Sequence, residues 1–555
     1  MTATAARVSV RGMKGLMQER PLNIPSILRH AERLHPQKTV ATKTADGVRV
    51  VTFAETVGRA RRLIGALRRL GVGADDRVAT FCWNHQAHLE AYLGVPCMGA
   101  ILHTLNIRLF ADDLVYIVEH AQDRLVIVDK SLWPAWEKVA ARVGCVERVI
   151  VVDDAPGALP EGTLDYESLL AAAEPAELVE VPEDHAAAMC YTSGTTGHPK
   201  GVVYTHRSNV LHSMALCMAD AFGIVERDVV MAIVPMFHAN AWGLPYACLL
   251  VGTDIVMPGR FLVPDVLTSL LVERGVTFAA GVPTIWQAML EPMKRSRDRL
   301  GRLRTVICGG SAVPPSLQKA FHREVGIRIV HAWGMTETSP MGSVCRPLAA
   351  HRDRPPDDLD ALLASQGRPV PGVEVRIVGE DGSELPWDGR AVGEIEARGN
   401  WIASAYYRDR ACDRFHDGWL RTGDVASIDP DGYIRICDRS KDLIKSGGEW
   451  ISSVALECML MAHPDVAEAA VIAVPHPRWC ERPLACVVPR PEARERLTRE
   501  ALIEHLRPRV ARWWLPDDVV FIDQIPKTSV GKFDKKALRE RFRAHVLPDA
   551  APPPG

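Results

Sequence analysis

One stretch of the sequence combines hydroxyl, glycine and lysine residues in an arrangement that suits the binding of an anion. Backbone N–H groups and hydroxyls of such a loop can surround phosphate oxygens, while the lysine supplies a positive charge. Its spacing differs from the G-x-x-x-x-G-K-[ST] pattern of the Walker loop, which excludes a site of that type. A surface turn is the alternative reading, because turns favour the same residues. The stretch is Tyr191-Thr192-Ser193-Gly194-Thr195-Thr196-Gly197-His198-Pro199-Lys200-Gly201.

Four further segments place charged or aromatic residues beside glycine or threonine. Taken singly, each has an ordinary structural explanation: Glu337 as an exposed carboxylate and Trp333 as a core side chain. In the same way, Asp424 suits a turn and Lys532 suits a solvated surface. Only their joint occurrence and order indicate a function. The segments are Trp333-Gly334-Met335-Thr336-Glu337, Gly418-Trp419-Leu420-Arg421-Thr422-Gly423-Asp424, Asp438-Arg439-Ser440-Lys441-Asp442, and Pro526-Lys527-Thr528 followed by Gly531-Lys532.

These five segments resemble, in order, the motifs of the adenylate-forming superfamily. That superfamily includes acyl-CoA synthetases, luciferases and the adenylation domains of peptide synthetases. The resemblance covers roughly residues 23–547 and is closest to the AMP-forming fatty-acid CoA ligases. A branch that activates 3-(methylthio)propionate is also similar. The residues that carry the two likenesses are Val234-Pro235-Met236-Phe237-His238-Ala239-Asn240-Ala241-Trp242 and His331-Ala332-Trp333-Gly334-Met335.

The resemblance implies that ATP and Mg²⁺ bind at these motifs. Glu337 and Thr196 would hold Mg²⁺ on the phosphates, and Thr336 would hydrogen-bond the α-phosphate. Lys532 would bridge the α-phosphate and the carboxylate of the acid, whose attack needs positioning and charge neutralisation more than acid–base help. The residues implied to surround the phosphates are Thr192, Ser193, Gly194, Thr195, Thr196, Gly197 and Lys200.

The resemblance also assigns the adenosine part of ATP. Trp333 would stack on adenine where many relatives use tyrosine, which keeps the aromatic face and loses a hydroxyl. Asp424 would accept both ribose hydroxyls, with Arg439 adding charge beside them. Small residues would let the backbone approach the adenine edge. These small residues are Gly309, Gly310 and Ser311, and Gly334 is also implied to bind the nucleotide.

A second half-reaction with coenzyme A requires a different geometry, because Lys532 then stands in the path of the thiol. In the superfamily the small domain rotates about a hinge, and Lys441 matches the hinge position. The loop that is then brought to the site matches Ser446-Gly447-Gly448-Glu449. Gly447 and Gly448 suit a close approach of the backbone to the pantetheine chain.

The acid pocket is expected around residues 237–246, 281–286 and 309–312. In relatives that activate amino acids, an aspartate follows the phenylalanine that matches Phe237 and pairs with the substrate ammonium. Here that position is His238, which favours an uncharged acyl tail. Trp242 resembles the gate of the fatty-acid tunnel, and Gly281 is expected at the pocket wall. A buried methylene contributes about 0.8 kcal/mol, but one bulky side chain can close a tunnel, so acyl length stays open.

Composition restricts the other functional classes. The 555 residues are 47% hydrophobic and 24% charged, with a net charge of −2, so no basic excess indicates nucleic acid or anionic lipid. The 13 cysteines include no C-x-x-C pair, which indicates free thiols in a reducing compartment such as the cytoplasm. His85 and His88 are spaced as a metal pair can be, but without an evident third ligand they are interpreted as surface or core histidines.

The elements that must position these residues alternate between helix and strand. A helix is predicted over residues 55–70, ended by two glycines. The alternation implies α/β layering with at least one largely parallel sheet. The apolar stretch 229–253 is interrupted by proline and polar residues, so a strand, a loop and a helix are predicted there instead of a membrane span. Strands are predicted near residues 77–82, 125–128, 149–152, 229–234, 254–257, 305–307, 328–330 and 374–378.

A domain boundary is predicted near Asp438. A turn-rich strand pair precedes it, and a new α+β pattern follows: a helix over 453–461, strands over 469–474 and 484–489, a helix over 498–510 and a strand over 518–522. The fold class is therefore α/β, with a large multi-sheet domain over residues 1–437 and a small mobile α+β domain over residues 438–555 that carries the lysine motif.

Together these features predict a ligase that activates a medium- or long-chain fatty acid with ATP through an acyl-adenylate and transfers the acyl group to CoA, releasing AMP and pyrophosphate. One alternative keeps this chemistry with 3-(methylthio)propionate or an aryl acid as substrate. Another is a non-catalytic adenylate-binding partner protein, against which Glu337 and Lys532 argue. The resemblance also implies a homodimer through the large domain.

Overall fold

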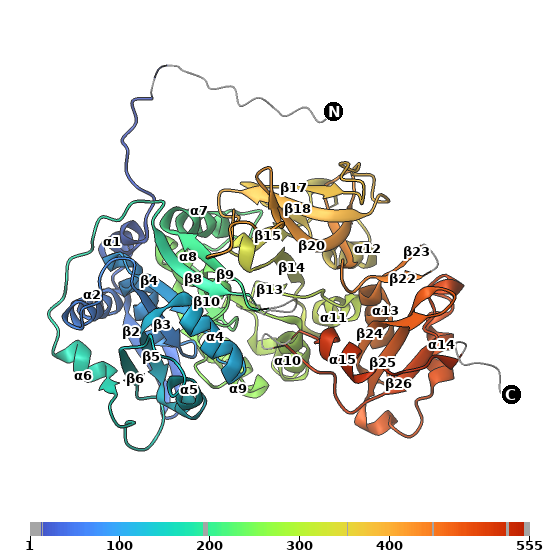
Figure 1. Cartoon of the computed structure of the whole chain (residues 1–555), viewed down its shortest axis with the longest axis horizontal. Helices are drawn as coiled ribbons and strands as arrows, with labels where there is room; N and C mark the ends of the chain where they lie inside the picture. Colours follow the sequence, from blue (N-terminus) through green and yellow to red (C-terminus); the bar gives the residue numbers. More distant parts are fainter. Residues whose placement is uncertain are drawn as a thin grey trace.

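The computed structural model describes residues 13, 15–192, 198–351, 353–446, 449–528 and 532–548. Strands and helices alternate along the chain and assemble into four sheets with helices on their faces, which confirms the predicted α/β class. The fourth sheet is built from the last part of the chain and lies at one end of the molecule (Figure 1).

The first sheet has seven strands in the order β7-β6-β5-β3-β4-β8-β9. All neighbours are parallel except β8 and β9, so the loops after β3, β4, β5 and β8 leave the same edge of the sheet. The strands are β3 (Arg77–Phe81), β4 (Ile101–Thr104), β5 (Asp123–Asp129), β6 (Arg148–Val152), β7 (Leu164–Asp165), β8 (Ala186–Tyr191) and β9 (Gly201–Thr205).

The second sheet has nine strands in the order β16-β15-β14-β13-β12-β10-β11-β1-β2. Its centre is parallel, whereas β2, β15 and β16 are antiparallel to their neighbours. The strands are β1 (Thr39–Thr44), β2 (Gly47–Thr52), β10 (Val229–Ala232), β11 (Asp254–Met257), β12 (Phe278–Gly281), β13 (Thr305–Gly309), β14 (Ile329–Gly334), β15 (Met341–Val344) and β16 (Arg368–Pro369).

Two smaller sheets complete the fold. The third is antiparallel and holds β17 (Val373–Val378), β18 (Gly393–Gly399), β19 (Phe415–His416), β20 (Trp419–Ile428) and β21 (Ile434–Arg439). The fourth is mixed and holds β22 (Ile444–Ser446), β23 (Glu449–Ile451), β24 (Val466–His476), β25 (Cys480–Pro489) and β26 (Asp518–Phe521).

Several of the helices begin at a residue whose side chain caps the first turn. The helix predicted over 55–70 begins two residues earlier, because Thr52 and Glu55 form a reciprocal capping box. The helices are α1 (Ile24–Leu34), α2 (Phe53–Arg69), α3 (Gln86–Gly94), α4 (Ala111–Ala121), α5 (Trp133–Ala140), α6 (Tyr166–Ala171), α7 (His206–Cys217), α8 (Leu244–Val251), α9 (Pro264–Glu273), α10 (Pro283–Arg295), α11 (Pro315–Ala320), α12 (Pro356–Leu363), α13 (Ser453–Met461), α14 (Arg499–Leu506) and α15 (Lys535–Arg541).

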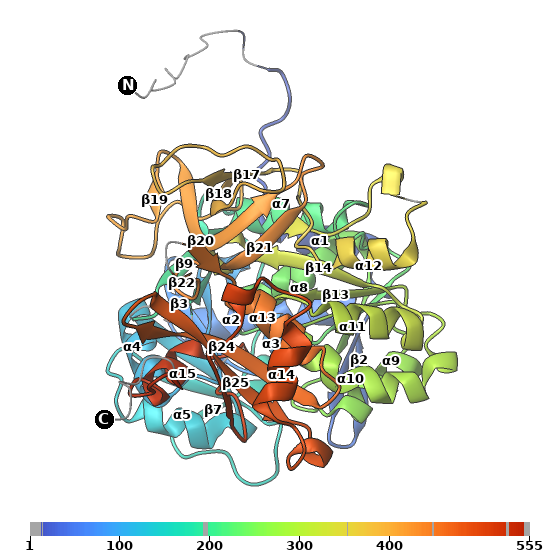
Figure 2. The ribbon, with the colours of Figure 1, turned by 90° about the vertical axis from the view of Figure 1, so that its right-hand side faces the viewer.

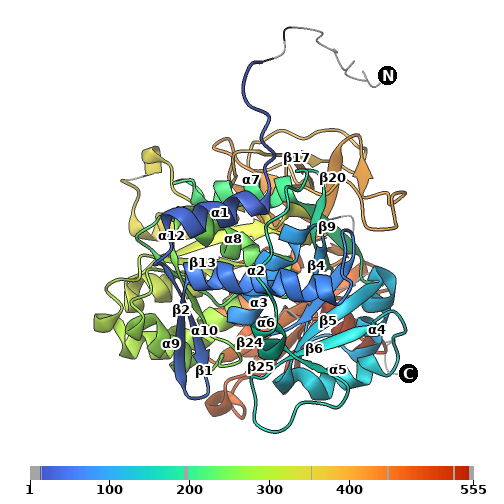
Figure 3. The same cartoon turned by 90° about the vertical axis from the view of Figure 1, so that its left-hand side faces the viewer.

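Separate hydrophobic cores hold these layers. Helices α1, α2, α3 and α8 belong to one core that also includes residues of the two large sheets, and Figure 3 shows α1 and α2 running across that side of the molecule. In the last part of the chain, α13 and α14 share a core on one face of the fourth sheet, and α15 packs on the other face (Figure 2).

The apolar stretch 229–253 folds as the sequence predicts: strand β10, then a loop with a short turn, then helix α8. Within the described residues, no helix combines the length and apolar character needed to cross a membrane. The predicted division between residues 437 and 438 falls inside β21, just before the turn that leads into the fourth sheet.

Candidate active site

The two large sheets bring the predicted nucleotide residues to one place. Strand β8 lies parallel to β4, with Thr104 opposite Cys190, and ends directly before the predicted phosphate loop. Of that loop, Thr192 and Lys200 lie in the described part of the chain, and their backbones are joined by a hydrogen bond of 2.9 Å. The predicted residues outside the described part are Ser193, Gly194, Thr195, Thr196 and Gly197.

A cavity of about 210 Å³ opens beside this loop. Both the first 437 residues and the last part of the chain contribute to its wall. Its polar lining includes Thr192, His198, Lys200, His238, Thr336, Glu337, Tyr406, Arg414, Arg439 and Lys532. Its apolar lining includes Phe222, Ile233, Val234, Pro235, Trp242, Leu262, Val282, Ile285, Ala332 and Met341. Charged and apolar side chains therefore line the same cavity.

Lys532 enters this cavity from the last part of the chain. A β-carbon added to Gly310 would lie 3.8 Å from its side-chain Cε, so the lysine lies against the loop that follows β13. Burial, with a smaller contribution from Arg439, lowers the pKa of the Lys532 ammonium to about 8. The ammonium therefore stays charged at neutral pH. Asp424 and Glu337 act on it electrostatically, but no ion pair of Lys532 occurs among the described residues, which suits the ammonium to an anionic ligand.

Glu337 lies on the cavity wall and is only 3% exposed. Its carboxylate accepts a hydrogen bond of 2.5 Å from the hydroxyl of Tyr406 and lies 3.3 Å from Arg414 Nη1. Arg414 also donates to the Tyr406 hydroxyl at 2.9 Å. The neighbouring Thr336 is fixed through its backbone carbonyl, which accepts a bond of 2.8 Å from the hydroxyl of Tyr204. The Thr336–Glu337 pair is thus held rigidly.

Asp424 is the second buried carboxylate of the site. The indole N–H of Trp333 donates to one of its oxygens at 2.8 Å, and Arg439 Nε lies 2.9 Å from the other. Strands β20 and β21 bring Asp424 and Arg439 opposite each other in their antiparallel pairing. The three residues that the sequence assigns to adenosine are therefore in direct contact.

The turn after β10 holds the predicted acid-pocket residues. Residues 239–242 all have positive φ between 43° and 57°, and Gly243 continues the left-handed course at 77°. This conformation costs non-glycine residues roughly 1–2 kcal/mol each. It places Trp242 against β13, where a β-carbon on Gly309 would lie 3.2 Å from the indole edge. Such local strain is typical of functional sites.

His238 precedes this turn and lines the cavity. Burial, assisted by Lys532, lowers the pKa of His238 to about 4, so its imidazole is neutral at pH 7. Gly281, by contrast, is not brought to the cavity. A β-carbon there would lie 3.0 Å from the ring of Trp286, and the next residue, Val282, lines the cavity instead.

A second cavity of about 770 Å³ lies between the large sheets and the last part of the chain. It continues the nucleotide site, because Gly310, Gly334, Trp333, Arg439 and Lys532 line both cavities. Ser311, Asp424 and Lys441 line only the second. Burial lowers the pKa of Lys441. Gly447 and Gly448, predicted to approach pantetheine, lie outside the described residues.

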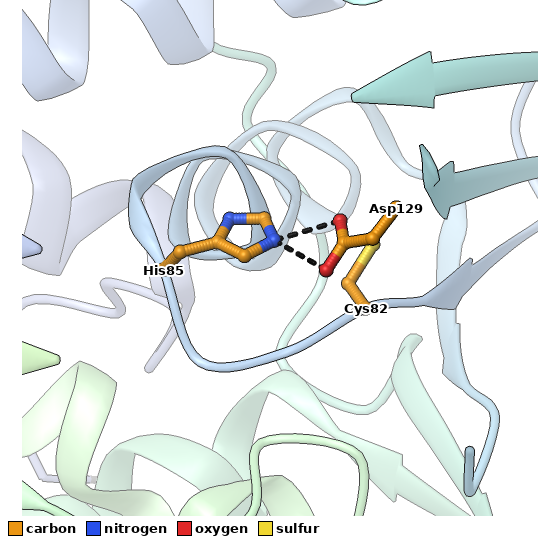
Figure 4. Close-up of side chains that lie close together, drawn as sticks. All are labelled: Cys82, His85 and Asp129. Carbon is orange, nitrogen blue, oxygen red and sulfur yellow. Dashed lines mark hydrogen bonds and ion pairs between the residues drawn. The ribbon is translucent and has the colours of Figure 1, made fainter. Parts of the chain in front are cut away.

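His85 and His88 lie elsewhere, at the start of α3. His85 Nδ1 accepts the backbone N–H of His88 at 3.3 Å, so Nε2 carries the proton and donates to Asp129, 2.8 Å from each oxygen. Cys82 lies beside this pair (Figure 4), and burial raises its pKa well above the ordinary value. A metal ion would have to displace the proton on His85 Nε2 and would need Cys82 as a thiolate. The geometry therefore favours a structural hydrogen bond between His85 and Asp129.

Several residues of the site escaped the sequence analysis. Tyr406 and Arg414 come from the segment before β20, and Tyr204 comes from β9. The signal for the first two was weak: an aromatic and a basic residue shortly before the segment that ends in Asp424. Arg108 comes from the loop after β4 and also lines the first cavity.

Comparison with known proteins shows to which family the chain belongs. The model of the AMP-binding enzyme family matches residues 28–407, and that of the AMP-binding enzyme C-terminal domain matches residues 455–532. The chain belongs to the AMP-binding enzyme family. This AMP-binding enzyme is 48% identical to a long-chain-fatty-acid–CoA ligase of Thermus thermophilus, over 95% of its own length and 97% of the relative's.

Other relatives of this AMP-binding enzyme differ in the acid. A 3-methylmercaptopropionyl-CoA ligase of Ruegeria lacuscaerulensis is 44% identical over 96% of this chain and 99% of its own. Among solved structures, the anthranilate CoA ligase AuaEII in complex with anthranoyl-AMP superimposes with a TM-score of 0.85 at 27% identity, covering 96% of this chain and 100% of that one. These findings confirm the predicted superfamily and its two-part architecture.

Proposed function

We propose that the protein is an AMP-forming acyl-CoA ligase that activates a medium- or long-chain fatty acid. The observation that carries the proposal is the cavity that Lys532 and Glu337 line together with apolar side chains such as Trp242. Among the described residues, Glu337 is the only acidic side chain that lines this cavity, and Tyr406 and Arg414 already engage it. An ammonium group on the acid would find no partner there, which favours an uncharged tail.

In the first half-reaction, a carboxylate oxygen of the acid attacks the α-phosphorus of ATP, and pyrophosphate leaves. Lys532 would neutralise both the carboxylate and the α-phosphate, which repel each other. Thr336 would hydrogen-bond the α-phosphate, and Lys200 and Thr192 would bind the leaving phosphates. Preorganised charges of this kind supply most of the stabilisation that such a transfer needs.

The remaining nucleotide contacts would come from residues that line the two cavities. We assign adenine stacking to Trp333, the ribose hydroxyls to Asp424 and the adenine edge to Gly309, Gly310 and Ser311, with Gly334 as a further nucleotide-binding residue. The Trp333–Asp424 hydrogen bond supports the assignment, because it holds the ring and the carboxylate in one fixed relation.

Magnesium is the metal that the family implies, and Glu337 fits it. A buried carboxylate on the wall of a phosphate site is the oxygen ligand that Mg²⁺ prefers. Glu337, with Thr196 of the phosphate loop, would hold the ion, which would neutralise negative charge on the phosphates. Tyr406 and Arg414 keep the carboxylate of Glu337 in place.

In the second half-reaction, the thiol of CoA attacks the acyl-adenylate and AMP leaves. We propose that residues 438–555 rotate about Lys441, which withdraws Lys532 and brings the loop with Gly447 and Gly448 to the site. The position of Lys441 supports this, since it lies in the turn between β21 and β22, where the third sheet passes into the fourth.

A second candidate keeps the chemistry and takes 3-(methylthio)propionate. The 44% identity to a ligase of that name favours it, as does the stretch from His331 to Met335. An aryl acid is the third candidate, and the fold likeness to an anthranilate CoA ligase supports it. A non-catalytic adenylate-binding role is disfavoured, because Lys532 and Glu337 are both present and both face the cavity.

The deciding experiment is a CoA-dependent AMP-release assay across straight-chain acids from short to long, with methylthiopropionate and benzoate included. Each added methylene that is buried should raise kcat/KM about fourfold, from about 0.8 kcal/mol per methylene, until the pocket is full. A maximum at medium or long chains supports the proposal. A maximum at methylthiopropionate or benzoate selects the corresponding alternative, and the absence of any acyl-adenylate refutes all three.

Two further expectations remain proposals. We place the protein in the cytoplasm, because its 13 cysteines are all free thiols. We also propose a homodimer through the large domain, which sedimentation or light scattering would test.

A further inference from the structure

Phe222 lines the first cavity, and its contacts place it on the deep side, away from Lys532. It comes from the turn after α7, is only 2% exposed and packs on Phe278, with the ring centroids 6.0 Å apart. Phe278 is the first residue of β12, and Gly281 is the last. At about 3.3 Å per residue, the length of β12 puts Phe278 roughly 10 Å below the carboxyl edge of the sheet. Lys532 lies at that edge, against the loop after β13.

The face of the second sheet that borders this cavity carries its side chains in rows, because residues two apart on a strand point to the same face. Gly309 and Ala332 are register partners in the row nearest the carboxyl edge, and both line the cavity. One row lower, Ala232 pairs with Ala280, and Ala280 pairs with Ile307. These three residues belong to the same buried core as the two phenylalanines.

The two adjacent alanines of the lower row leave space over β10 and β12. Protein interiors are close-packed, so a bulky neighbour must fill space of this kind. Phe222 packs on Phe278, which lies on β12 one row below Ala280. The phenyl ring of Phe222 is therefore placed to fill the space over Ala232 and Ala280 and to close the cavity at this depth.

Two arginines hold the turn that carries Phe222. Arg346 donates to the backbone oxygen of Ala221 through Nε at 3.0 Å and to that of Phe222 through Nη2 at 3.1 Å. Arg304 donates to the backbone oxygen of Gly223 at 2.8 Å. Charged donors on three successive carbonyl oxygens leave the turn little freedom, so the ring is held at a fixed depth.

We propose that Phe222 is the floor of the acid pocket and sets the longest acyl chain that the protein accepts, with Arg346 as a positioning residue. This inference rests on the proposed ligase function. The carboxylate of the acid would lie near Lys532, and the tail would run down the sheet face past Gly309 and Ala332 until its end meets the phenyl ring. A rigid floor excludes longer chains, because an extra methylene would have to displace a packed side chain.

The test compares Phe222→Ala, which removes the ring, with Phe222→Leu, which replaces it by a smaller apolar side chain. Phe81→Ala and Phe81→Leu are the matched controls. Phe81 is fully buried, packs on Trp136 with the ring centroids 5.8 Å apart and belongs to a different core. Acid-dependent pyrophosphate exchange across straight-chain acids gives kcat/KM for each chain length and KM for ATP. Thermal melting checks that each variant is folded.

In Phe222→Ala the longest acid that is adenylated should gain about two to four carbons, because loss of the ring opens space over Ala232 and Ala280. Acids beyond the original limit should gain about fourfold in kcat/KM for each newly buried methylene, while KM for ATP changes less than about threefold. Phe222→Leu should give a smaller extension, and the Phe81 variants should keep the original limit. An unchanged limit in folded Phe222→Ala would overturn the inference, as would an equal extension in the Phe81 variants.

A double variant tests the path of the tail. Ala280→Val, added to Phe222→Ala, refills part of the opened space, so the limit should return toward that of the unaltered protein. If the double variant accepts the same long acids as Phe222→Ala, the added carbons lie elsewhere and the proposed path is wrong.

Arg346→Gln tests the positioning role. It removes a charged donor from the turn, so kcat/KM should fall less steeply beyond the original limit while KM for ATP stays unchanged. A limit as sharp as that of the unaltered protein would show that Arg346 does not position the floor.

Calorimetric titration with straight-chain acids, on the intact chain, provides a readout besides turnover. Phe222→Ala should bind longer acids than the unaltered protein and the Phe81 variants do. If the unaltered protein forms no acyl-adenylate but Phe222→Ala extends the range of acids that bind, the ligase proposal fails and the floor of the pocket stands. If acyl-adenylates form and the limit is the same in both proteins, the assignment of Phe222 fails alone.

Discussion

At the scale of single residues, Lys532 is the side chain from the last part of the chain that lines the first cavity together with residues of the large sheets. Lys532→Ala removes the ammonium that lies against Gly310 without altering the rest of the cavity. Loss of one preorganised charge should lower the rate of adenylation at least about a hundredfold to a thousandfold. Acid-dependent pyrophosphate exchange measures this step. Transfer from a preformed acyl-adenylate to CoA should largely survive, and an equal loss in both assays would refute the role.

The pKa of Lys532 predicts a pH dependence. Its folded value of about 8 lies below the ordinary 10.5, so the charged form is lost as pH rises through 8. kcat/KM for adenylation, which reports the free enzyme, should therefore fall about tenfold per pH unit above 8. His238, with a pKa of about 4, stays neutral between pH 6 and 9, so its titration does not contribute to this fall in kcat/KM.

Lys532→Arg provides the control for that pH profile. An arginine keeps its charge throughout this range, so the fall in kcat/KM above pH 8 should disappear even if the rate is lower. If kcat/KM of Lys532→Arg still falls above pH 8, the fall is due to the titration of another group.

The site residues separate into those that a sequence can reveal and those that it cannot. Lys532, Glu337 and Asp424 lie in short segments with recognisable neighbours. Glu337 lines the first cavity, Asp424 the second and Lys532 both. Tyr406 and Arg108 carry no such local signature. They reach the site because distant strands become neighbours, and a single sequence does not encode pairing of that kind in its local pattern.

At the scale of elements, the left-handed turn over residues 239–243 sets the position of Trp242. Trp242→Ala should change the preference among acids about tenfold or more while KM for ATP changes less than threefold, because the indole lies on the apolar side of the cavity. The chain-length profile and KM for ATP measure the two effects. A larger change in KM for ATP than in acid preference would remove Trp242 from the acid pocket.

The helices and strands show how far the sequence pattern predicts the bounds of an element. Helix α13 occupies the predicted range 453–461, and the Ser452 side chain caps its first turn. Strand β14 runs from Ile329 to Gly334, longer than the predicted 328–330, since its last residues are paired by β13 and β15 and not by a run of β-branched residues. The left-handed turn was not predicted at all: three of its five residues are alanine or tryptophan, which normally avoid positive φ.

At the scale of the whole molecule, the proposed rotation about Lys441 would serve the two half-reactions in turn. Lys441→Pro fixes one backbone angle at the turn between β21 and β22. No backbone hydrogen bond from the Lys441 N–H occurs within the described ranges, so the substitution should be tolerated structurally. Adenylation should stay within about threefold of the unaltered protein, whereas thioester formation should fall at least about tenfold.

Lys441→Ala distinguishes the effect of losing the side-chain charge from the effect of restricting the backbone. It removes the ammonium and leaves the turn free, so both half-reactions should proceed. A rate of thioester formation in Lys441→Pro equal to that in Lys441→Ala would contradict a hinge at this position. Rapid-quench measurement of AMP-bound and CoA-bound acyl groups follows the two steps separately.

The position of Lys532 on the cavity wall has a consequence for energy economy. If the last part of the chain excludes water from the cavity while Lys532 is in place, as the proposed mechanism requires, a newly made mixed anhydride is protected from hydrolysis. The protein should therefore consume little ATP when thiol is scarce, holding its reactive product in reserve until an acceptor arrives.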